Sequence, residues 1–222
     1  MPRPTFFNLP EDKRAHVVEA LKAEFAARPY ARASVDRVIA AAGVSKGSFY
    51  QYFENKEDAY AHLVRELMGA RVGPVGDPVP EASFEEVLAA VVRGSRDFHL
   101  RDPLGWAVLA RALADDAPPV LESDRSVSDG VHRWAVAAIA AGQASGELRG
   151  DVDADTAAWM IERTLLGVPH YVMTRFNVDP ERAAADGSAF DRPEIARVAD
   201  DVVALLAAAL KTPRARGGEN RA

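Results

Sequence analysis

Apolar residues recur along the chain at spacings of three and four, which is the pattern of helices that bury one face. Alternating apolar and polar runs, which would predict half-buried strands, do not occur between turn signals. The segment 193–210 illustrates the pattern, with apolar residues at Ile195, Val198, Val202, Leu206 and Leu210. The spacing therefore predicts an all-α fold of about nine helices.

Proline and glycine residues divide this helical pattern into parts. The stretch GARVGPVGDPVPEA, residues 69–82, holds three of each, and both residue types disfavour the interior of a helix. We therefore expect a linker between a small N-terminal unit and a larger helical domain. The predicted parts are an N-terminal unit at 1–55, a connecting helix at 56–72, the linker at 73–82, a helical domain at 83–211 and a disordered polar tail at 212–222.

The composition is typical of a globular protein and excludes several kinds of site. The 222 residues are 48% hydrophobic and 27% charged, and none is cysteine, which excludes disulfides and thiolate metal sites. The sequence has no run of about 18 apolar residues and no signal-peptide core near its N-terminus. Its histidines are isolated and lack metal-ligand spacing. We expect a cytoplasmic protein without a membrane segment, a metal or a cofactor.

The net charge of −6 is unevenly distributed along the chain. Residues 1–70 carry 10 Lys and Arg against 9 Asp and Glu, a net charge of +1. Residues 71–222 carry 17 and 24, a net charge of −7. Because the acidic excess lies downstream, the N-terminal unit is compatible with a local basic surface that binds nucleic acid.

Residues 43–47 read GVSKG, which has the form G-x-S-x-G of the nucleophile elbow in α/β-hydrolases. That motif requires a buried strand before the serine, whereas the preceding SVDRVIAAA has helical spacing and an alanine run. The chain also lacks an HGGG-like oxyanion loop. A hydrolase that uses Ser45 is therefore a disfavoured alternative, and we assign no catalytic residue.

The same residues fit a helix-turn-helix, in which two short helices meet through a tight turn. Ala41 or Ala42 gives a small residue late in the first helix, Gly43 supplies the turn, and Val44 supplies a buried apolar side chain. Ser45 then caps the second helix. In that helix Phe49 turns inward and Lys46, Ser48 and Tyr50 lie on the outer face, while Gly47 leaves room for the backbone to approach DNA. The pattern predicts a DNA-binding unit.

Residues 34–56, SVDRVIAAAGVSKGSFYQYFENK, resemble the DNA-binding segment of the TetR (tetracycline repressor) family of bacterial regulators. The positions that match the family pattern outright are Gly43, Val44, Ser45, Gly47, Tyr50, Phe53, Lys56 and Glu57. The chain departs from it at Ser34 and Ser48, where threonine is usual, at Phe49 for leucine, and at Tyr52 for histidine. The resemblance implies a three-helix DNA-binding domain followed by a ligand-binding and dimerisation domain.

The resemblance also implies roles for individual residues. Tyr50, Tyr52, Lys56 and Ser34 would mostly contact phosphates, whereas Lys46 and Ser48 are better placed for base edges. The alternative for Tyr50 and Tyr52 is that they pack the small domain. The predicted DNA-binding residues are Ser34, Ser45, Lys46, Gly47, Ser48, Tyr50, Tyr52 and Lys56.

The downstream domain contains all three tryptophans of the chain. If it follows the family layout, its helices enclose a mostly apolar pocket for a small, largely apolar effector. The alternative is that these side chains form an ordinary core. The predicted pocket residues are Phe98, Trp106, Trp134, Trp159, Met160, His170 and Tyr171.

Two helices, predicted at about 154–173 and 193–210, are apolar on more than one face. Such helices would leave apolar surface in water unless a second copy of the chain covered it, and the family uses them for a homodimer. A two-fold dimer would bind an inverted repeat with half-sites about 34–36 Å apart, or a multiple of this. The predicted interface residues are Ile161, Leu165, Val168, Ile195, Val198, Val202 and Leu206.

These observations together predict a sequence-specific transcriptional regulator, and not an enzyme. It would be a repressor whose affinity for double-stranded operator DNA falls when an effector binds the helical domain. The alternative is a protein-interaction module that has the same fold but does not bind DNA.

Overall fold

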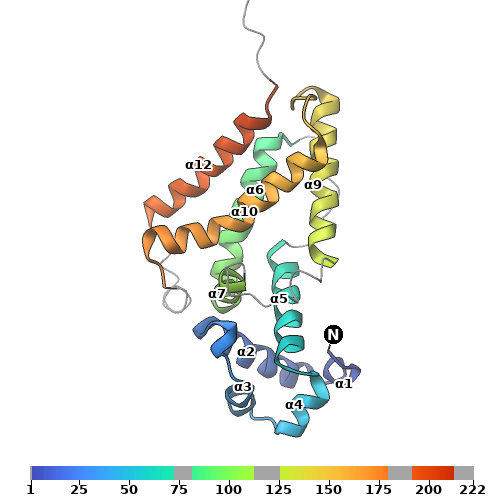
Figure 1. Ribbon diagram of the computed structural model, residues 1–222, viewed down its shortest axis with the longest axis vertical. Helices are drawn as coiled ribbons and strands as arrows, with labels where there is room; N and C mark the ends of the chain where they lie inside the picture. Colours follow the sequence, from blue (N-terminus) through green and yellow to red (C-terminus); the bar gives the residue numbers. More distant parts are fainter. Residues whose placement is uncertain (1, 73–81, 113–125, 180–191, 213–222) are drawn as a thin grey trace, which may run out of the picture.

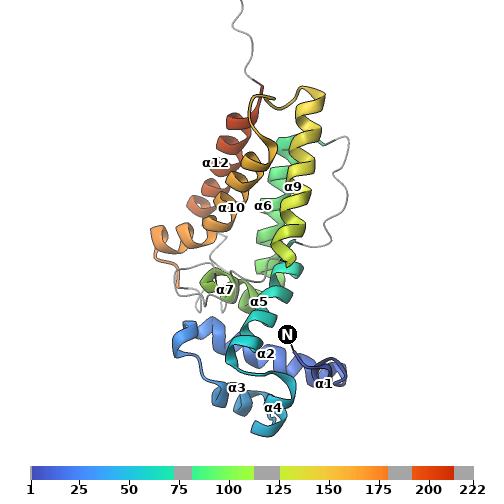
Figure 2. The same ribbon diagram turned by 45° about the vertical axis from the view of Figure 1, so that its right-hand side comes forward.

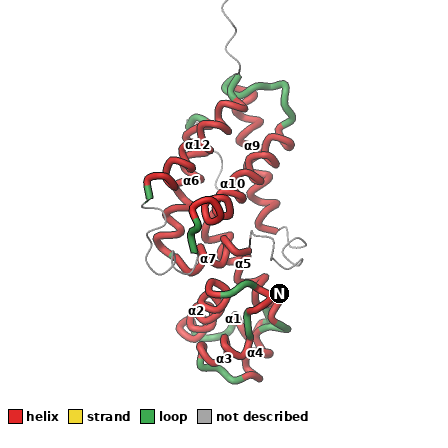
Figure 3. The backbone as a smooth tube through the Cα atoms, turned by 60° about the vertical axis from the view of Figure 1, so that its left-hand side comes forward, coloured by secondary structure: helices red, strands yellow, loops and turns green. Residues whose placement is uncertain are grey.

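The computed structural model describes residues 2–72, 82–112, 126–179 and 192–212. The regular elements in these ranges are helices, with one isolated bridge between Leu148 and Lys211, so the all-α prediction is confirmed (Figure 3). None of the described helices is long and apolar enough to cross a membrane. The predicted linker at 73–82 and tail at 212–222 lie outside the described residues except for Ala82 and Thr212.

The N-terminal unit contains the three expected helices and one more that periodicity did not predict. Its elements are α1 (Pro4–Phe7), α2 (Glu11–Ala27), a 3-10 turn (Tyr30–Arg32), α3 (Val35–Ala42) and α4 (Lys46–Tyr52). The four-residue α1 buries Phe6, whose ring centroid lies 4.9 Å from that of Phe53. The helix is too short for a repeat of apolar positions, so its sequence carries no amphipathic signal.

A single long helix, α5 (Lys56–Val72), leaves the N-terminal unit and enters the body of the molecule (Figure 1). The body consists of α6 (Phe84–Arg101), α7 (Pro103–Ala112), α9 (Ser126–Ser145), α10 (Ala154–Phe176) and α12 (Pro193–Leu210). Helices α6, α9, α10 and α12 lie together at the end of the molecule opposite α3 and α4 (Figure 2). Their core includes Leu88, Ile139, Ile161 and Leu206.

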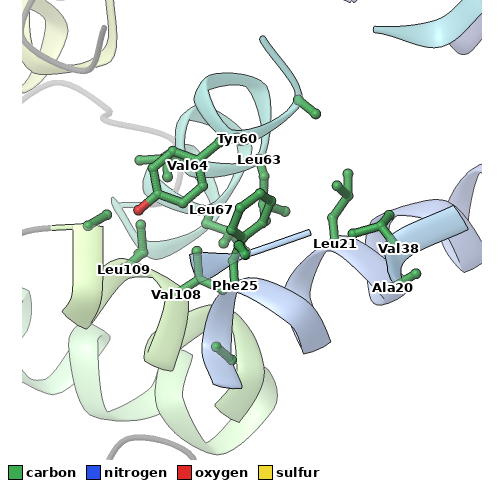
Figure 4. Close-up of a cluster of buried hydrophobic side chains, with 14 of the residues drawn as sticks. Ala20, Leu21, Phe25, Val38, Tyr60, Leu63, Val64, Leu67, Val108 and Leu109 are labelled. Atoms are coloured by element: carbon green, nitrogen blue, oxygen red, sulfur yellow. The ribbon is translucent and has the colours of Figure 1, made fainter. Parts of the chain in front are cut away.

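The core of the N-terminal unit continues into the body. Leu21 and Phe25 of α2 pack in one buried cluster with Leu63 of α5 and with Val108 and Leu109 of α7 (Figure 4). The Nε of Arg111 donates to the carbonyl of Ala26, 2.8 Å away, which also joins α7 to α2. Helix α7 is therefore shared between the two units, and the N-terminal unit is packed against the body through it.

Gly105 allows the close contact of α7 with α5. A Cβ atom at this position would lie 2.7 Å from the Cδ2 of Leu67, which is shorter than real carbon contacts allow. The Cβ would also lie 2.7 Å from the Cγ of Asp102, so Gly105 leaves room for the Asp102 carboxylate and the Leu67 side chain at this contact.

Candidate nucleic-acid interface and apolar cavity

The turn between α3 and α4 has the geometry predicted for a helix-turn-helix. Gly43 closes α3 in the left-handed conformation, with φ of 64°. The Oγ of Ser45 accepts a hydrogen bond of 3.0 Å from the backbone N–H of Ser48 and so caps α4. Because a helix and not a strand precedes Ser45, the turn is not a nucleophile elbow.

The two faces of α4 differ in burial. Phe49 and Phe53 are buried and anchor the helix on the domain core. On the other side Lys46 and Gly47 are exposed and Tyr50 keeps 41% of its surface accessible. Helices α3 and α4 lie at the end of the molecule farthest from the body, so this outer face is open to a large partner (Figures 1 and 2).

An acidic residue that the sequence analysis did not single out faces the same surface. The Nζ of Lys46 lies 3.1 Å from the Oδ1 of Asp36 on α3, and both side chains are exposed. The hydrogen bond and the charge of Asp36 raise the pKa of Lys46 above its usual value. An acceptor on a base edge would therefore compete with Asp36 for this lysine.

Two residues predicted to contact DNA are placed elsewhere. Tyr52 is only 5% exposed and its ring packs near Phe6 of α1, so the packing alternative describes it correctly. The Nζ of Lys56 donates to the carbonyls of Tyr30 and Ala33 at 2.8 and 3.1 Å. It also lies 4.3 Å from the centre of the Tyr30 ring. These contacts turn both side chains toward the protein, and a phosphate contact by either residue stays a prediction.

Ser34 precedes α3, but its side chain makes no capping hydrogen bond. Its backbone N–H donates instead to the Oε1 of Glu24 on α2, at 2.8 Å. Glu24 is buried and also binds Arg37 at 2.6 Å and Arg28 at 3.1 Å. Burial by itself raises the pKa of Glu24, but the hydrogen bonds from Arg37 and Ser34 lower it below the usual value. The carboxylate therefore fixes α3 on α2.

A cavity of about 50 Å³ lies among α5, α6, α7, α10 and α12. Its walls are mostly aliphatic, with one charged residue and one hydroxyl among the described residues. The lining residues are Arg71, Val91, Val92, Ser95, Trp106, Leu165, Val168, Pro169, Val172, Ile195, Ala199 and Val202.

Only Trp106 of the seven predicted pocket residues lines this cavity. Phe98 is buried in the core that continues from the N-terminal unit, and Trp134 and Met160 pack against the core of the body. The other three, Trp159, His170 and Tyr171, are exposed. These six residues do not line the cavity, since helical spacing identifies apolar faces without showing what each face contacts, and an effector pocket that includes them stays a prediction.

Several residues predicted for the dimer interface line the cavity instead, namely Leu165, Val168, Ile195 and Val202. Ile161 and Leu206 are buried in the core of the body, and Val198 is half-buried. The large apolar residues that are exposed on α10 and α12 are Trp159, Tyr171 and Leu205, at 56%, 46% and 70%. Most of the residues assigned to the interface thus pack within one protomer, and the interface and its residues stay a prediction.

The fold and the site define a helix-turn-helix protein with a helical body that encloses a small apolar cavity. The family described as bacterial regulatory proteins, tetR family, matches residues 17–63. The crystal structure of a TetR family transcriptional regulator from Chloroflexus aurantiacus J-10-FL is similar over 96% of this chain and 99% of that one, with 30% identity and a TM-score of 0.69. The chain belongs to the TetR family and is a transcriptional regulator.

Two further relatives come from Bacillus subtilis. The fatty acid metabolism regulator protein of strain 168 is 26% identical over 161 residues, which are 69% of this chain and 79% of that protein. The structure of the transcriptional regulator FadR in complex with stearoyl-CoA covers 87% of this chain and 97% of its own, with 22% identity and a TM-score of 0.66.

Proposed function

We propose that this regulator is a repressor that binds operator DNA through the outer face of α4. The exposed side of α4 carries this proposal, because Lys46, Gly47 and Tyr50 stand open on a helix whose other side is fixed in the core. Tyr50 would donate to a phosphate, and Lys46 and Ser48 would contact base edges. Ser45 caps the helix at the same surface. Its site of action would be the cytoplasm, where bacterial DNA lies.

The functional unit is a homodimer that uses the outer faces of α10 and α12. Trp159 and Leu205 leave large apolar areas accessible there, and a second copy would cover them. A two-fold axis between the copies would present two α4 helices to an inverted repeat, with half-sites about 34–36 Å apart or a multiple of it.

The effector enters the cavity and shifts the population toward a state that binds DNA weakly. At about 50 Å³ the cavity is smaller than typical ligand pockets, so an effector would have to separate the surrounding helices. Because α5 and α7 belong to both the cavity and the core of the DNA-binding unit, such a movement would reach α4. The B. subtilis relatives, one named for fatty acid metabolism and one bound to stearoyl-CoA, make fatty-acid derivatives the first class to test.

The DNA-binding proposal is tested by selecting bound fragments from the source genome with wild type and with Tyr50→Ala. Enrichment of one inverted repeat by the wild type, weakened in the variant, supports it. Circular dichroism of both proteins controls for folding. If neither protein recovers fragments above background at low salt, the proposal fails and the interaction-module alternative gains support.

The dimer proposal is tested by sedimentation of Leu205→Glu. A charge at this 70% exposed position should give monomers with intact helicity. The matched control is Leu100→Glu on α6, where the leucine is 55% exposed and lies outside the proposed interface. A dimer that survives Leu205→Glu unchanged would contradict the use of this face.

A further inference from the structure

Arg71 is the one charged residue among the described lining of the cavity. It lies in the last turn of α5 and shares the cavity lining with apolar residues of α10 and α12 such as Leu165 and Val202. Ser95 of α6 adds a hydroxyl to the same lining. The cavity thus combines an aliphatic wall with a single cation, which is an unusual set of residues for a plain core.

Within the described parts of the chain, no carboxylate lies within ion-pair distance of Arg71, and no carbonyl or hydroxyl accepts a hydrogen bond from it. Part of the side chain is still accessible, but burial lowers the pKa of its guanidinium. Arginine nevertheless stays protonated at neutral pH. A desolvated cation that lacks an anion is costly to the folded protein, and such groups are usually paired.

We propose that Arg71 binds the acidic head group of the effector. This head group is a carboxylate attached directly to an apolar body. This inference rests on the proposed function and specifies the chemical class of its effector. The planar guanidinium can hold a carboxylate through two parallel hydrogen bonds. The aliphatic lining then accepts the rest of the molecule, and Ser95 adds a hydroxyl to the same cavity.

A free acid and a coenzyme A ester differ in where their negative charge lies relative to the apolar chain. In the ester a neutral thioester carbonyl replaces the carboxylate, and the phosphates stand at the far end of a long arm. Arg71 borders the apolar lining directly, so a charge next to the apolar body matches it, and a distant phosphate does not. The geometry therefore favours the acid.

The test compares decanoic acid, decanol and decanoyl-CoA as probes, by calorimetry on wild type and on Arg71→Met. Methionine keeps most of the side-chain length without the charge. We expect the wild type to bind the acid at least about 10-fold more tightly than the alcohol, because only the acid forms a charged hydrogen-bonded pair with Arg71. Arg71→Met should lose this preference and keep its affinity for the alcohol. The control is Arg93→Met, an exposed arginine of α6.

Three results would overturn the inference. One is equal binding of acid and alcohol by the wild type, or no binding of the acid. Another is unchanged acid binding by Arg71→Met. The third is tight binding of decanoyl-CoA, but not of the acid, that depends on Arg71, because the recognised charge would then belong to the nucleotide.

A measurement without any ligand gives an independent readout. If the effector supplies the counter-ion of Arg71, the buried charge destabilises the protein while no effector is bound. Arg71→Met should then stabilise the free protein and raise its Tm by about 2–4 °C. A structural role would give a lower Tm, which contradicts the inference. Operator binding by the wild type separates the two proposals. If the wild type does not bind DNA, the proposed function fails, whereas a wild type that binds DNA but not the acid contradicts this inference alone.

Discussion

The Nζ of Lys22 lies 2.7 Å from the carboxylate of Asp102, and this contact joins α2 of the DNA-binding unit to the corner between α6 and α7. The side chains are only 13% and 23% exposed. Asp102 also accepts a hydrogen bond of 2.8 Å from the N–H of Gly105 in the first turn of α7. Burial alone would lower the pKa of Lys22, but the hydrogen bonds to Asp102 and Glu19 raise it. The pair thus connects the DNA-binding unit to the body by charge as well as by apolar packing.

A double-mutant cycle on this pair should give a coupling energy of about 1 kcal/mol in the free energy of unfolding, measured with Lys22→Met and Asp102→Asn in urea. The matched cycle uses Glu19→Gln. Glu19 lies at a similar 2.8 Å from Lys22 but is 58% exposed, so solvent should reduce its coupling to a few tenths of a kcal/mol. Equal coupling in the two cycles would contradict a special contribution from the partly buried pair.

Gly47→Ala should weaken operator binding without destabilising the protein. A Cβ at this position would meet only the Oγ of Ser45, at an ordinary 3.8 Å, and alanine favours a helix over glycine by about 0.5–1 kcal/mol. Any loss of affinity would therefore report the close approach of DNA to the backbone of α4. The measurement pairs urea unfolding with fluorescence anisotropy on an operator duplex. Unchanged affinity would mean that DNA does not approach this part of the helix.

Substitutions of Lys46 and of Asp36 should change the affinity for DNA in opposite directions. Lys46→Ala should weaken DNA binding and relax the base preference at one position of each half-site, because a base-edge contact is lost. Asp36→Asn should strengthen binding, since it removes a negative charge that competes for the same lysine. Lys211→Ala, an exposed lysine at the end of α12, is the control and should change neither quantity. Weaker binding by Asp36→Asn would show that Asp36 positions Lys46 for DNA.

The parts of the site that sequence predicted are those fixed by neighbouring residues. The left-handed Gly43 and the cap from Ser45 to Ser48 lie within a few residues of one another, so their types and spacing suffice. The places of Tyr52 and Lys56 depend instead on distant partners. Phe6 of α1 lies against Tyr52, and the carbonyls of Tyr30 and Ala33 bind Lys56. The sequence near Tyr52 and Lys56 does not predict these contacts with distant residues.

The cavity was beyond sequence reasoning for a related reason. Helical periodicity identifies Leu165 and Trp159 alike as apolar positions of one helix, but it does not say what lies opposite each of them. In the structure Leu165 lines the cavity and Trp159 faces outward. Large aromatic side chains were the sequence-based choice for a pocket, whereas the cavity is lined mainly by valines and other aliphatic residues.

Two histidines should contribute to the free energy of unfolding with opposite dependence on pH. His132 on α9 lies between Asp155 and Glu162 of α10, at 2.9 and 3.0 Å, and its hydrogen bonds to them raise its pKa. Its stabilising contribution is complete below the unfolded value of about 6.5 and is lost as the pH rises through the raised pKa. His62 is buried against the ring of Phe6, and this burial lowers its pKa. Its contribution is complete above about 6.5 and declines as the pH falls toward the lowered pKa.

Urea unfolding between pH 5 and 8.5 measures both effects against wild type. His132→Gln should be most destabilising at low pH, where the wild type carries the charged imidazole between two carboxylates, and the difference should shrink as the pH rises. His62→Phe should show the reverse, gaining on the wild type as the pH falls, because it has no imidazole to protonate among the aromatic rings. Each variant is the other's control, since a general effect of pH on the fold would shift both in the same direction. Parallel profiles for the two variants would rule out these opposite assignments.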